Sequence, residues 1–180
     1  MGIKRLFAAL ISGLFMTQTA VAASAAGTDL ENTLYLELKG GRVVIQLRPD
    51  LAPKTVKRIK ELVRQKFYDG IVFHRVIDGF MAQTGDPTGT GTGGSGKNLM
   101  AEFNNGSHTR GAVSMARAND PNSADSQFFI VLKDSTFLDH QYTAFGYVVS
   151  GMEYVDQIKK GEPPVDPDKI VSLRVAADVK

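Results

Sequence analysis

The chain has 180 residues, with 21 basic and 19 acidic side chains and no cysteine. Residues 1–26 contain two of the basic residues and no acidic one, so 19 basic side chains remain against 19 acidic ones in the rest of the chain. A neutral chain without a basic run gives no electrostatic basis for binding nucleic acid or an anionic membrane. Without cysteine, disulfides are excluded, and 43% apolar residues suffice for one core.

The N-terminus predicts a secretory signal peptide over residues 1–25. A basic start precedes an apolar run over Leu6–Met16, and small residues then allow cleavage after Ala22 or Ala25. The run is too short to span a bilayer, although an uncleaved anchor is the alternative. We therefore expect a periplasmic or secreted protein that leaves the membrane after cleavage, with a single domain over residues 30–178.

The first half of that domain predicts a hairpin and a helix. Residues 33–39 alternate, residues 42–47 are nearly apolar on both faces, and Gly40-Gly41 between them is typical of a hairpin turn. Residues 54–65 place their apolar side chains on one helical stripe behind Pro53.

The second half predicts further short strands and one more helix. Strands are expected over residues 72–77, 112–116, 127–132, 145–149 and 170–175, a helix over 151–160, and a proline-rich covering loop over 161–168. About eight strands with two helices favour a β-barrel or sandwich with helical caps.

The most unusual stretch is FHRVIDGFMAQTGD, which begins at Phe73. Its first residues are β-branched or aromatic, which predicts a strand, and alternation places Arg75 on one face with Phe73 and Ile77. A guanidinium among apolar groups requires a reason, because arginine is rarely buried without partners. A purely structural reason would be snorkelling, or an ion pair with Asp78 or Asp86.

Two glycine-rich patterns in residues 85–97 match nucleotide-binding motifs only superficially. Residues 89–94 fit G-x-G-x-x-G, and residues 91–97 fit a Walker A run as far as its lysine. No buried strand precedes them, no long amphipathic helix follows, and Asn98 occupies the position of the magnesium-binding hydroxyl. We therefore expect a loop that binds no phosphate.

The residues that a zinc site or a nucleophilic serine or cysteine would require are missing from the sequence. The histidines at 74, 108 and 140 have no zinc-site spacing, and the chain has neither a G-x-S-x-G serine nor a cysteine nucleophile. We expect no metal and no cofactor. The remaining inventory, an arginine and a glutamine among Phe and Met, suits a reaction that needs an apolar pocket and a hydrogen-bond donor.

Five segments in order resemble the cyclophilin family of peptidyl-prolyl cis-trans isomerases: FHRVIDGFMAQTGD, GTGGSG, GAVSMAR, SQFFI, and FLDH followed by FG. The resemblance covers residues 33–175 and is closest to the exported bacterial members. It implies a mainly-β fold, a closed eight-stranded antiparallel barrel capped by two α-helices.

The resemblance also implies a groove on the outside of the barrel. Its catalytic residues would be Arg75, Gln83 and Phe80, and its substrate-binding residues Met81, Ala116, Arg117, Gln127, Phe129, Phe137, Leu138 and Tyr142. The chain departs from the best-known eukaryotic members at three of them, where Phe137 replaces Trp, Tyr142 replaces His and Arg117 replaces Asn. The Asn position works largely through its backbone, so Arg117 should be tolerated.

The implied activity is isomerisation of Xaa-Pro bonds in exported proteins, with no covalent or acid–base step. Arg75 would donate a hydrogen bond to the prolyl nitrogen of the twisted amide. The expected partners are proline-containing polypeptides, the expected binding of cyclosporin is weak, and the expected state is a monomer. The alternative is a proline-peptide-binding holdase with little turnover.

Overall fold

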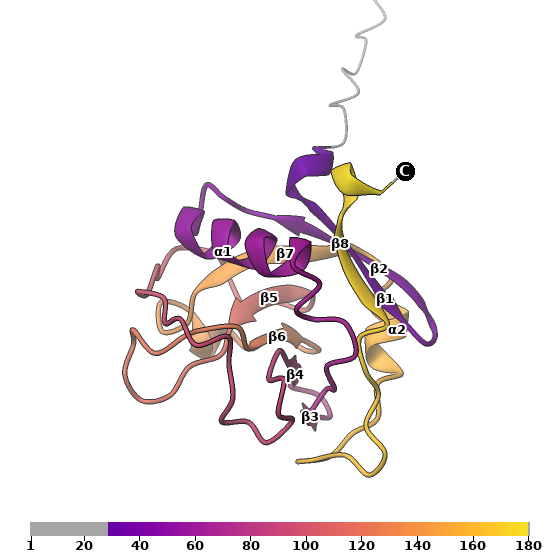
Figure 1. The fold of residues 1–180 in the computed structure, drawn as a ribbon. Helices are drawn as coiled ribbons and strands as arrows, with labels where there is room; N and C mark the ends of the chain where they lie inside the picture. Colours follow the sequence, from indigo (N-terminus) through magenta and orange to yellow (C-terminus); the bar gives the residue numbers. More distant parts are fainter. Residues whose placement is uncertain (1–28, 180) are drawn as a thin grey trace, which may run out of the picture.

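The computed structural model describes residues 29–179, and Figure 1 shows a curled sheet with two helices on its borders. The predicted signal peptide over residues 1–25 lies outside the described residues. The strands are β1 (Thr33–Leu38), β2 (Gly41–Leu47), β3 (Arg75–Ile77), β4 (Met81–Thr84), β5 (Ala112–Met115), β6 (Phe128–Val131), β7 (Ala144–Ser150) and β8 (Ser172–Val175). The helices are α1 (Pro53–Arg64) and α2 (Met152–Asp156), with short 3-10 turns at η1 (Leu30–Asn32), η2 (Thr136–Leu138) and η3 (Ala176–Asp178). No helix within residues 29–179 is long and apolar enough to cross a membrane.

All eight strands form one antiparallel sheet in the order β3-β4-β6-β5-β7-β2-β1-β8. The expectation of a closed barrel is wrong, because no ladder joins the edge strands β3 and β8. Near this seam the described residues form only single bridges, from Val72 to Lys169 and from Val76 to Gly161. The segment opposite β3 contains Pro163, Pro164 and Pro167, which have no N–H to donate to a ladder.

Apolar side chains are buried on both faces of the middle strands. The main core fills the inside of the curled sheet and includes Val113, Phe128 and Ile130. A second apolar cluster lies on the outer face, formed by Met81, Ala112, Phe129, Val131 and Leu138. Because both faces are covered, every residue of β5 and β6 is buried, including Ser114, and neither strand alternates buried with exposed positions.

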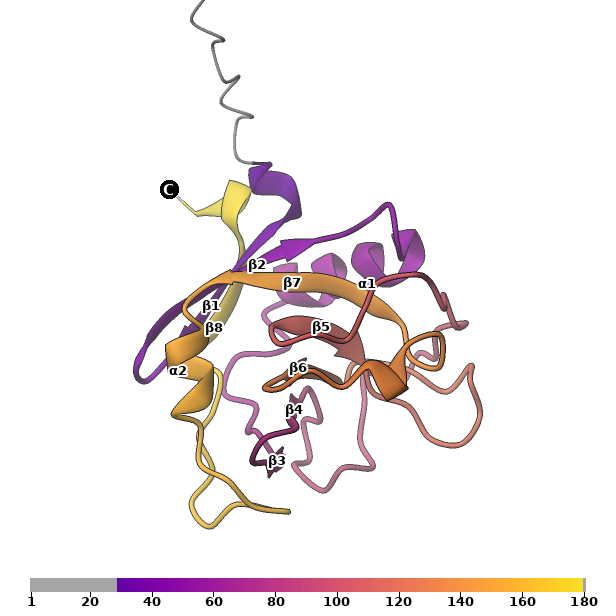
Figure 2. The same cartoon turned by 180° about the vertical axis from the view of Figure 1, so that it is seen from behind.

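Most predicted elements are confirmed, but several of their bounds differ. The hairpin pairs Leu38 with Gly41, so its two-residue turn lies one position earlier than predicted. Strand β4 was not predicted separately, and α2 is shorter than the predicted helix over 151–160. Figure 2 shows α2 beside the β1–β2 hairpin and α1 near the other end of β2.

The strand predicted over residues 72–77 begins only at Arg75. Upstream, the Phe73 amide donates to the Asp168 carbonyl at 2.9 Å, which holds this segment against the chain before β8 rather than in the ladder. Phe73 consequently lies in the main core beside Val76. The prediction that Phe73 and Arg75 share a face is therefore wrong, because the two-residue period applies only within a continuous strand.

Candidate functional site

A pocket of about 110 Å³ opens on the outer face of the sheet, above the second apolar cluster. Nine of the eleven residues implied by the resemblance line it: Arg75, Phe80, Met81, Gln83, Ala116, Arg117, Phe129, Leu138 and Tyr142. Residues 75 to 83 come from the β3–β4 hairpin. Of the others, Ala116 and Arg117 follow β5, Phe129 belongs to β6, Leu138 ends η2 and Tyr142 lies in the loop before β7. The fold thus brings together side chains that are up to 67 positions apart, from Arg75 to Tyr142.

The pocket floor is apolar and buried. Met81, Phe129 and Leu138 are 2%, 5% and 8% exposed, and they belong to the same outer cluster. The Phe129 ring packs edge-on against Tyr142 at 5.9 Å between centroids. An apolar ring bound here would be removed from water on that side.

Arg75 lies on the edge strand β3, with its side chain 42% exposed. It shares the outer face with Ile77, which packs against the outer cluster. Its Nε donates to Glu162 Oε2 at 2.8 Å, so its partner is neither Asp78 nor Asp86. This ion pair was absent from the sequence prediction, since Glu162 is 87 residues away.

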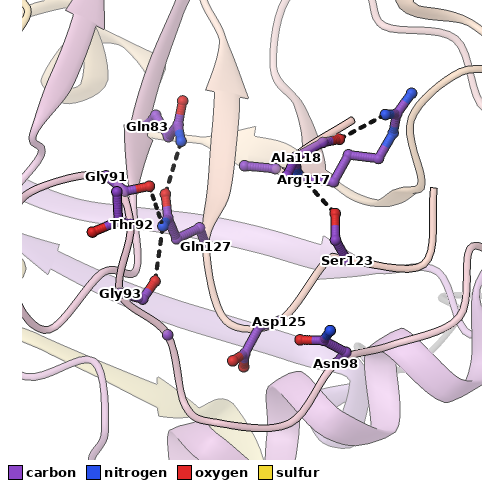
Figure 3. Close-up of a pocket in the computed structure, with 12 residues that line it drawn as sticks. Gln83, Gly91, Thr92, Gly93, Asn98, Arg117, Ala118, Ser123, Asp125 and Gln127 are labelled. Carbon is purple, nitrogen blue, oxygen red and sulfur yellow. Dashed lines mark hydrogen bonds between the residues drawn. The ribbon is translucent and has the colours of Figure 1, made fainter. Parts of the chain in front are cut away.

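Gln83 and Gln127 are connected by a hydrogen bond of 2.9 Å from Gln83 Nε2 to Gln127 Oε1. Gln127 Nε2 donates in turn to the carbonyls of Gly91 and Gly93, as Figure 3 shows. Gln127 does not line the 110 Å³ pocket but an adjoining polar pocket of about 390 Å³, which shares Gln83, Ala116 and Arg117 with it. Gln127 therefore ties the glycine-rich loop to Gln83.

Backbone amides of the glycine-rich loop donate hydrogen bonds to the carboxylate of Asp86, at the start of the same loop. Asp86 is 1% exposed and accepts from the amides of Thr88, Gly91 and Gly93. Burial alone would raise the pKa of Asp86, but these bonds and one from the Thr88 hydroxyl outweigh it and hold the pKa well below its usual range. The amides that resemble a phosphate cradle are thus occupied within the protein.

The Arg117 side chain bridges two loops at the pocket rim. Its guanidinium donates to the carbonyls of Ala118, Asn119 and Gln141, and its Cζ lies 4.7 Å from the centroid of the Tyr142 ring. The expectation that this position acts mainly through its backbone does not include these side-chain contacts. Arg117 and Tyr142, two departures from the eukaryotic pattern, are in direct contact.

Phe137 does not line the pocket. Phe137 is 65% exposed, and its ring stacks on the ring of Phe80, with centroids 5.7 Å apart and an interplanar angle of 28°. It therefore extends the apolar surface outward from Phe80.

Sequence reasoning missed a buried polar chain beneath the pocket. The His108 ring places Nε2 at 2.9 Å from Ser114 Oγ and Nδ1 at 2.8 Å from Asp139 Oδ1. Ser114 and His108 are both fully buried, and the imidazole stacks on Phe129. A serine sealed from solvent cannot attack a substrate, so this chain supports Phe129. The only sequence signal was Asp139 within FLDH.

The described residues 29–179 contain no group of three or more His, Asp or Glu side chains placed to hold a metal ion.

Comparison with known proteins agrees with this geometry. Residues 33–175 match the family described as cyclophilin type peptidyl-prolyl cis-trans isomerase/CLD. A probable peptidyl-prolyl cis-trans isomerase of Brucella suis is 51% identical over 91% of this chain and 89% of its own length. Peptidyl-prolyl cis-trans isomerase B of Bacillus subtilis is 42% identical over 71% of this chain and 90% of its own.

Solved structures show the same fold. A cyclophilin from Hirschia baltica has a TM-score of 0.78 and 32% identity, covering 84% of this chain and 76% of that one. A cyclophilin type isomerase of Cryptosporidium parvum, crystallised in the presence of the dipeptide Ala-Pro, has a TM-score of 0.74 and 30% identity, covering 79% and 98%. The fold and these matches define a peptidyl-prolyl cis-trans isomerase. The chain belongs to the cyclophilin-type peptidyl-prolyl cis-trans isomerase family.

Proposed function

We propose that the protein accelerates rotation about Xaa-Pro bonds in exported polypeptides and thereby assists their folding, with Arg75 as the decisive donor. The observation that carries this proposal is the Arg75 guanidinium at the wall of a pocket whose floor is apolar, on the outer face of the sheet.

The chemical problem is a rotational barrier of about 18–20 kcal/mol. Uncatalysed exchange takes about 10–100 s, whereas cis and trans differ by only about 0.5–1 kcal/mol. In the twisted transition state the amide loses its resonance, and the lone pair of the prolyl nitrogen becomes a hydrogen-bond acceptor. A fixed donor aimed at that nitrogen binds the twisted form better than either planar form. Arg75 suits this role because its guanidinium keeps its proton.

The apolar floor would hold the pyrrolidine ring. Phe80, Met81, Phe129 and Leu138 surround a volume of about 110 Å³, which suits one small ring. The isomerase structure obtained in the presence of Ala-Pro supports a proline-containing ligand for this family. Excluding water from the slot would strengthen the contact of Arg75 with the substrate.

The polar pocket beside it would hold the flanking peptide. Gln83, supported by Gln127, and the main chain at Ala116 and Arg117 lie between the two pockets. These groups would fix the carbonyl that precedes the proline. Millisecond turnover requires roughly 5–6 kcal/mol of transition-state stabilisation, of which one preorganised donor supplies about 3–4. Clamping and desolvation must supply the rest.

The alternative is a holdase that binds proline peptides with little turnover. The placement of Arg75 supports the enzyme, because a binder needs no donor directed at the prolyl nitrogen. The deciding experiment is a protease-coupled isomerisation assay of the mature protein on an Xaa-Pro peptide. A rate that rises in proportion to protein concentration is expected, whereas peptide binding without acceleration would favour the holdase.

Export is the second part of the proposal. It rests on the basic start, apolar run and small residues of positions 1–25. Mass spectrometry of the exported protein should find an N-terminus after Ala22 or Ala25. An exported pool that retains Met1 would contradict cleavage.

A further inference from the structure

The edge of β3 is paired with the proline-rich loop over residues 161–168. Val76 and Gly161 exchange two backbone hydrogen bonds of 2.8 Å in an antiparallel bridge. In an antiparallel bridge, the residue before Val76 lies opposite the residue after Gly161. The backbone therefore places Glu162 directly beside Arg75, although no ladder pairs these two residues.

The Arg75 and Glu162 side chains form an ion pair through a single hydrogen bond. Glu162 Oε2 accepts from Arg75 Nε at 2.8 Å, and this is the one ion pair that Arg75 makes within residues 29–179. A bond at Nε fixes the plane of the guanidinium and leaves its two terminal nitrogens for other acceptors. Those nitrogens belong to the side chain that lines the pocket.

We propose that Glu162 is a positioning residue that orients the Arg75 guanidinium for the twisted prolyl amide. This inference rests on the proposed function of Arg75. A free arginine side chain samples many rotamers, and a donor is most effective when its orientation is set before the transition state forms. Glu162 supplies that orientation without touching the substrate.

The size of the effect is limited by solvent. The Arg75 and Glu162 side chains are 42% and 52% exposed, so water and salt screen their attraction. We expect Glu162→Ala to lower kcat about two- to fivefold at low ionic strength and to change KM less. Glu162→Gln should retain most of the activity, because its amide oxygen still accepts from Nε. At 1 M salt, where the screening length is about 3 Å, the difference between Glu162→Ala and the unchanged protein should shrink.

The matched control lies on the same loop. Asp166 pairs with Lys159 at 2.6 Å and makes no contact with Arg75, and asparagine tolerates its positive φ of 50°. Asp166→Asn should leave kcat and KM unchanged. A melting temperature measured for every variant separates altered orientation from altered folding.

The catalytic role of Arg75 and the positioning role of Glu162 can be tested separately. In an Arg75→Ala background, which has no guanidinium to orient, Glu162→Ala should have no additional effect. Full activity of Arg75→Ala would overturn the proposed function. If Arg75→Ala loses activity while Glu162→Ala keeps its kcat at low salt, only the positioning role is overturned. A loss in Asp166→Asn equal to that in Glu162→Ala would also overturn it, since the loop as a whole would then be responsible.

Discussion

The Arg117 guanidinium lies over the Tyr142 ring, with Cζ 4.7 Å from the ring centroid. The same group bonds the carbonyls of Ala118 and Gln141, so it connects the loop after β5 to the loop before β7. The two residues that differ from the eukaryotic pattern at this rim thus act as a pair. The contact between Arg117 and Tyr142 therefore helps to hold one wall of the pocket in place.

Replacing Arg117 with Ala should raise KM about two- to fivefold, with kcat nearly unchanged. The reason is that an exposed cation–π contact contributes about 0.5–1 kcal/mol and here steadies a binding wall rather than the reacting bond. Arg117→Lys should recover only part, because an ammonium lacks the planar fork. Steady-state kinetics on one Xaa-Pro peptide measures this, with Arg48→Ala, which removes an exposed Arg48–Asp50 pair, as the control. A fall in kcat with constant KM would contradict the positional role.

Arg75→Ala should reduce kcat/KM by about 100-fold or more while the fold survives, because it removes the donor to the prolyl nitrogen. Arg75→Lys should also be poor, since its point charge on a different stem loses the fork geometry. The unchanged protein should keep nearly constant activity between about pH 6 and 9, because the guanidinium retains its proton there. A bell-shaped profile in this range would point to a titrating acid or base instead.

Phe137→Trp should tighten cyclosporin inhibition more than it changes turnover. Phe137 is 65% exposed and carries no hydrogen-bond donor, whereas the tryptophan that the family resemblance implies at this place would carry an indole N–H. An unpaired drug carbonyl costs about 1–3 kcal/mol, which is roughly ten- to a hundredfold in affinity. Titrating both proteins with the drug in the isomerase assay tests this. Equal inhibition constants would shift attention to Tyr142.

Stability should fall with acid because of His74. This residue is 5% exposed, and neither ring nitrogen has a hydrogen-bond partner among the described residues. Burial lowers the pKa of His74 from its usual value of 6.5, despite the opposing charge of Asp86. The folded state therefore binds this proton more weakly than the unfolded state, so the stabilising contribution exists above about pH 6.5 and is lost as the pH falls below it.

Denaturant unfolding between pH 7.5 and 5 measures that contribution. The free energy of unfolding should decline toward acid with a slope of at most about 1.4 kcal/mol per pH unit from this one group. His74→Leu should flatten the decline, whereas His140→Asn, at an exposed position, should not. Asp86 adds a separate loss below about pH 4, because its pKa is held down in the folded state. An unchanged slope in His74→Leu would exclude His74 as the source.

Local patterns in the sequence predict the elements of this fold well. The apolar stripe behind Pro53 predicts α1, which buries Val56, Ile59 and Leu62, and the glycine pair near residue 40 predicts the β1–β2 hairpin. The ordered motifs from Phe73 onward predict the family, and nine of the eleven implied site residues line one pocket. These features depend on residue type and spacing along the chain, which a sequence displays directly.

Only the tertiary structure decided how those elements close around the site. The Glu162–Arg75 ion pair joins residues 87 positions apart, and the contact of Arg117 with Tyr142 depends on how two loops meet. The open seam arises because prolines opposite β3 cannot complete a ladder, although each strand on its own is compatible with a closed barrel. Phe73 entered the core because the chain before β3 is bonded to Asp168. Such long-range pairings produce no periodic pattern in the sequence. The periodicity of apolar residues shows which face of one helix or strand is buried, but not which distant segment packs against it.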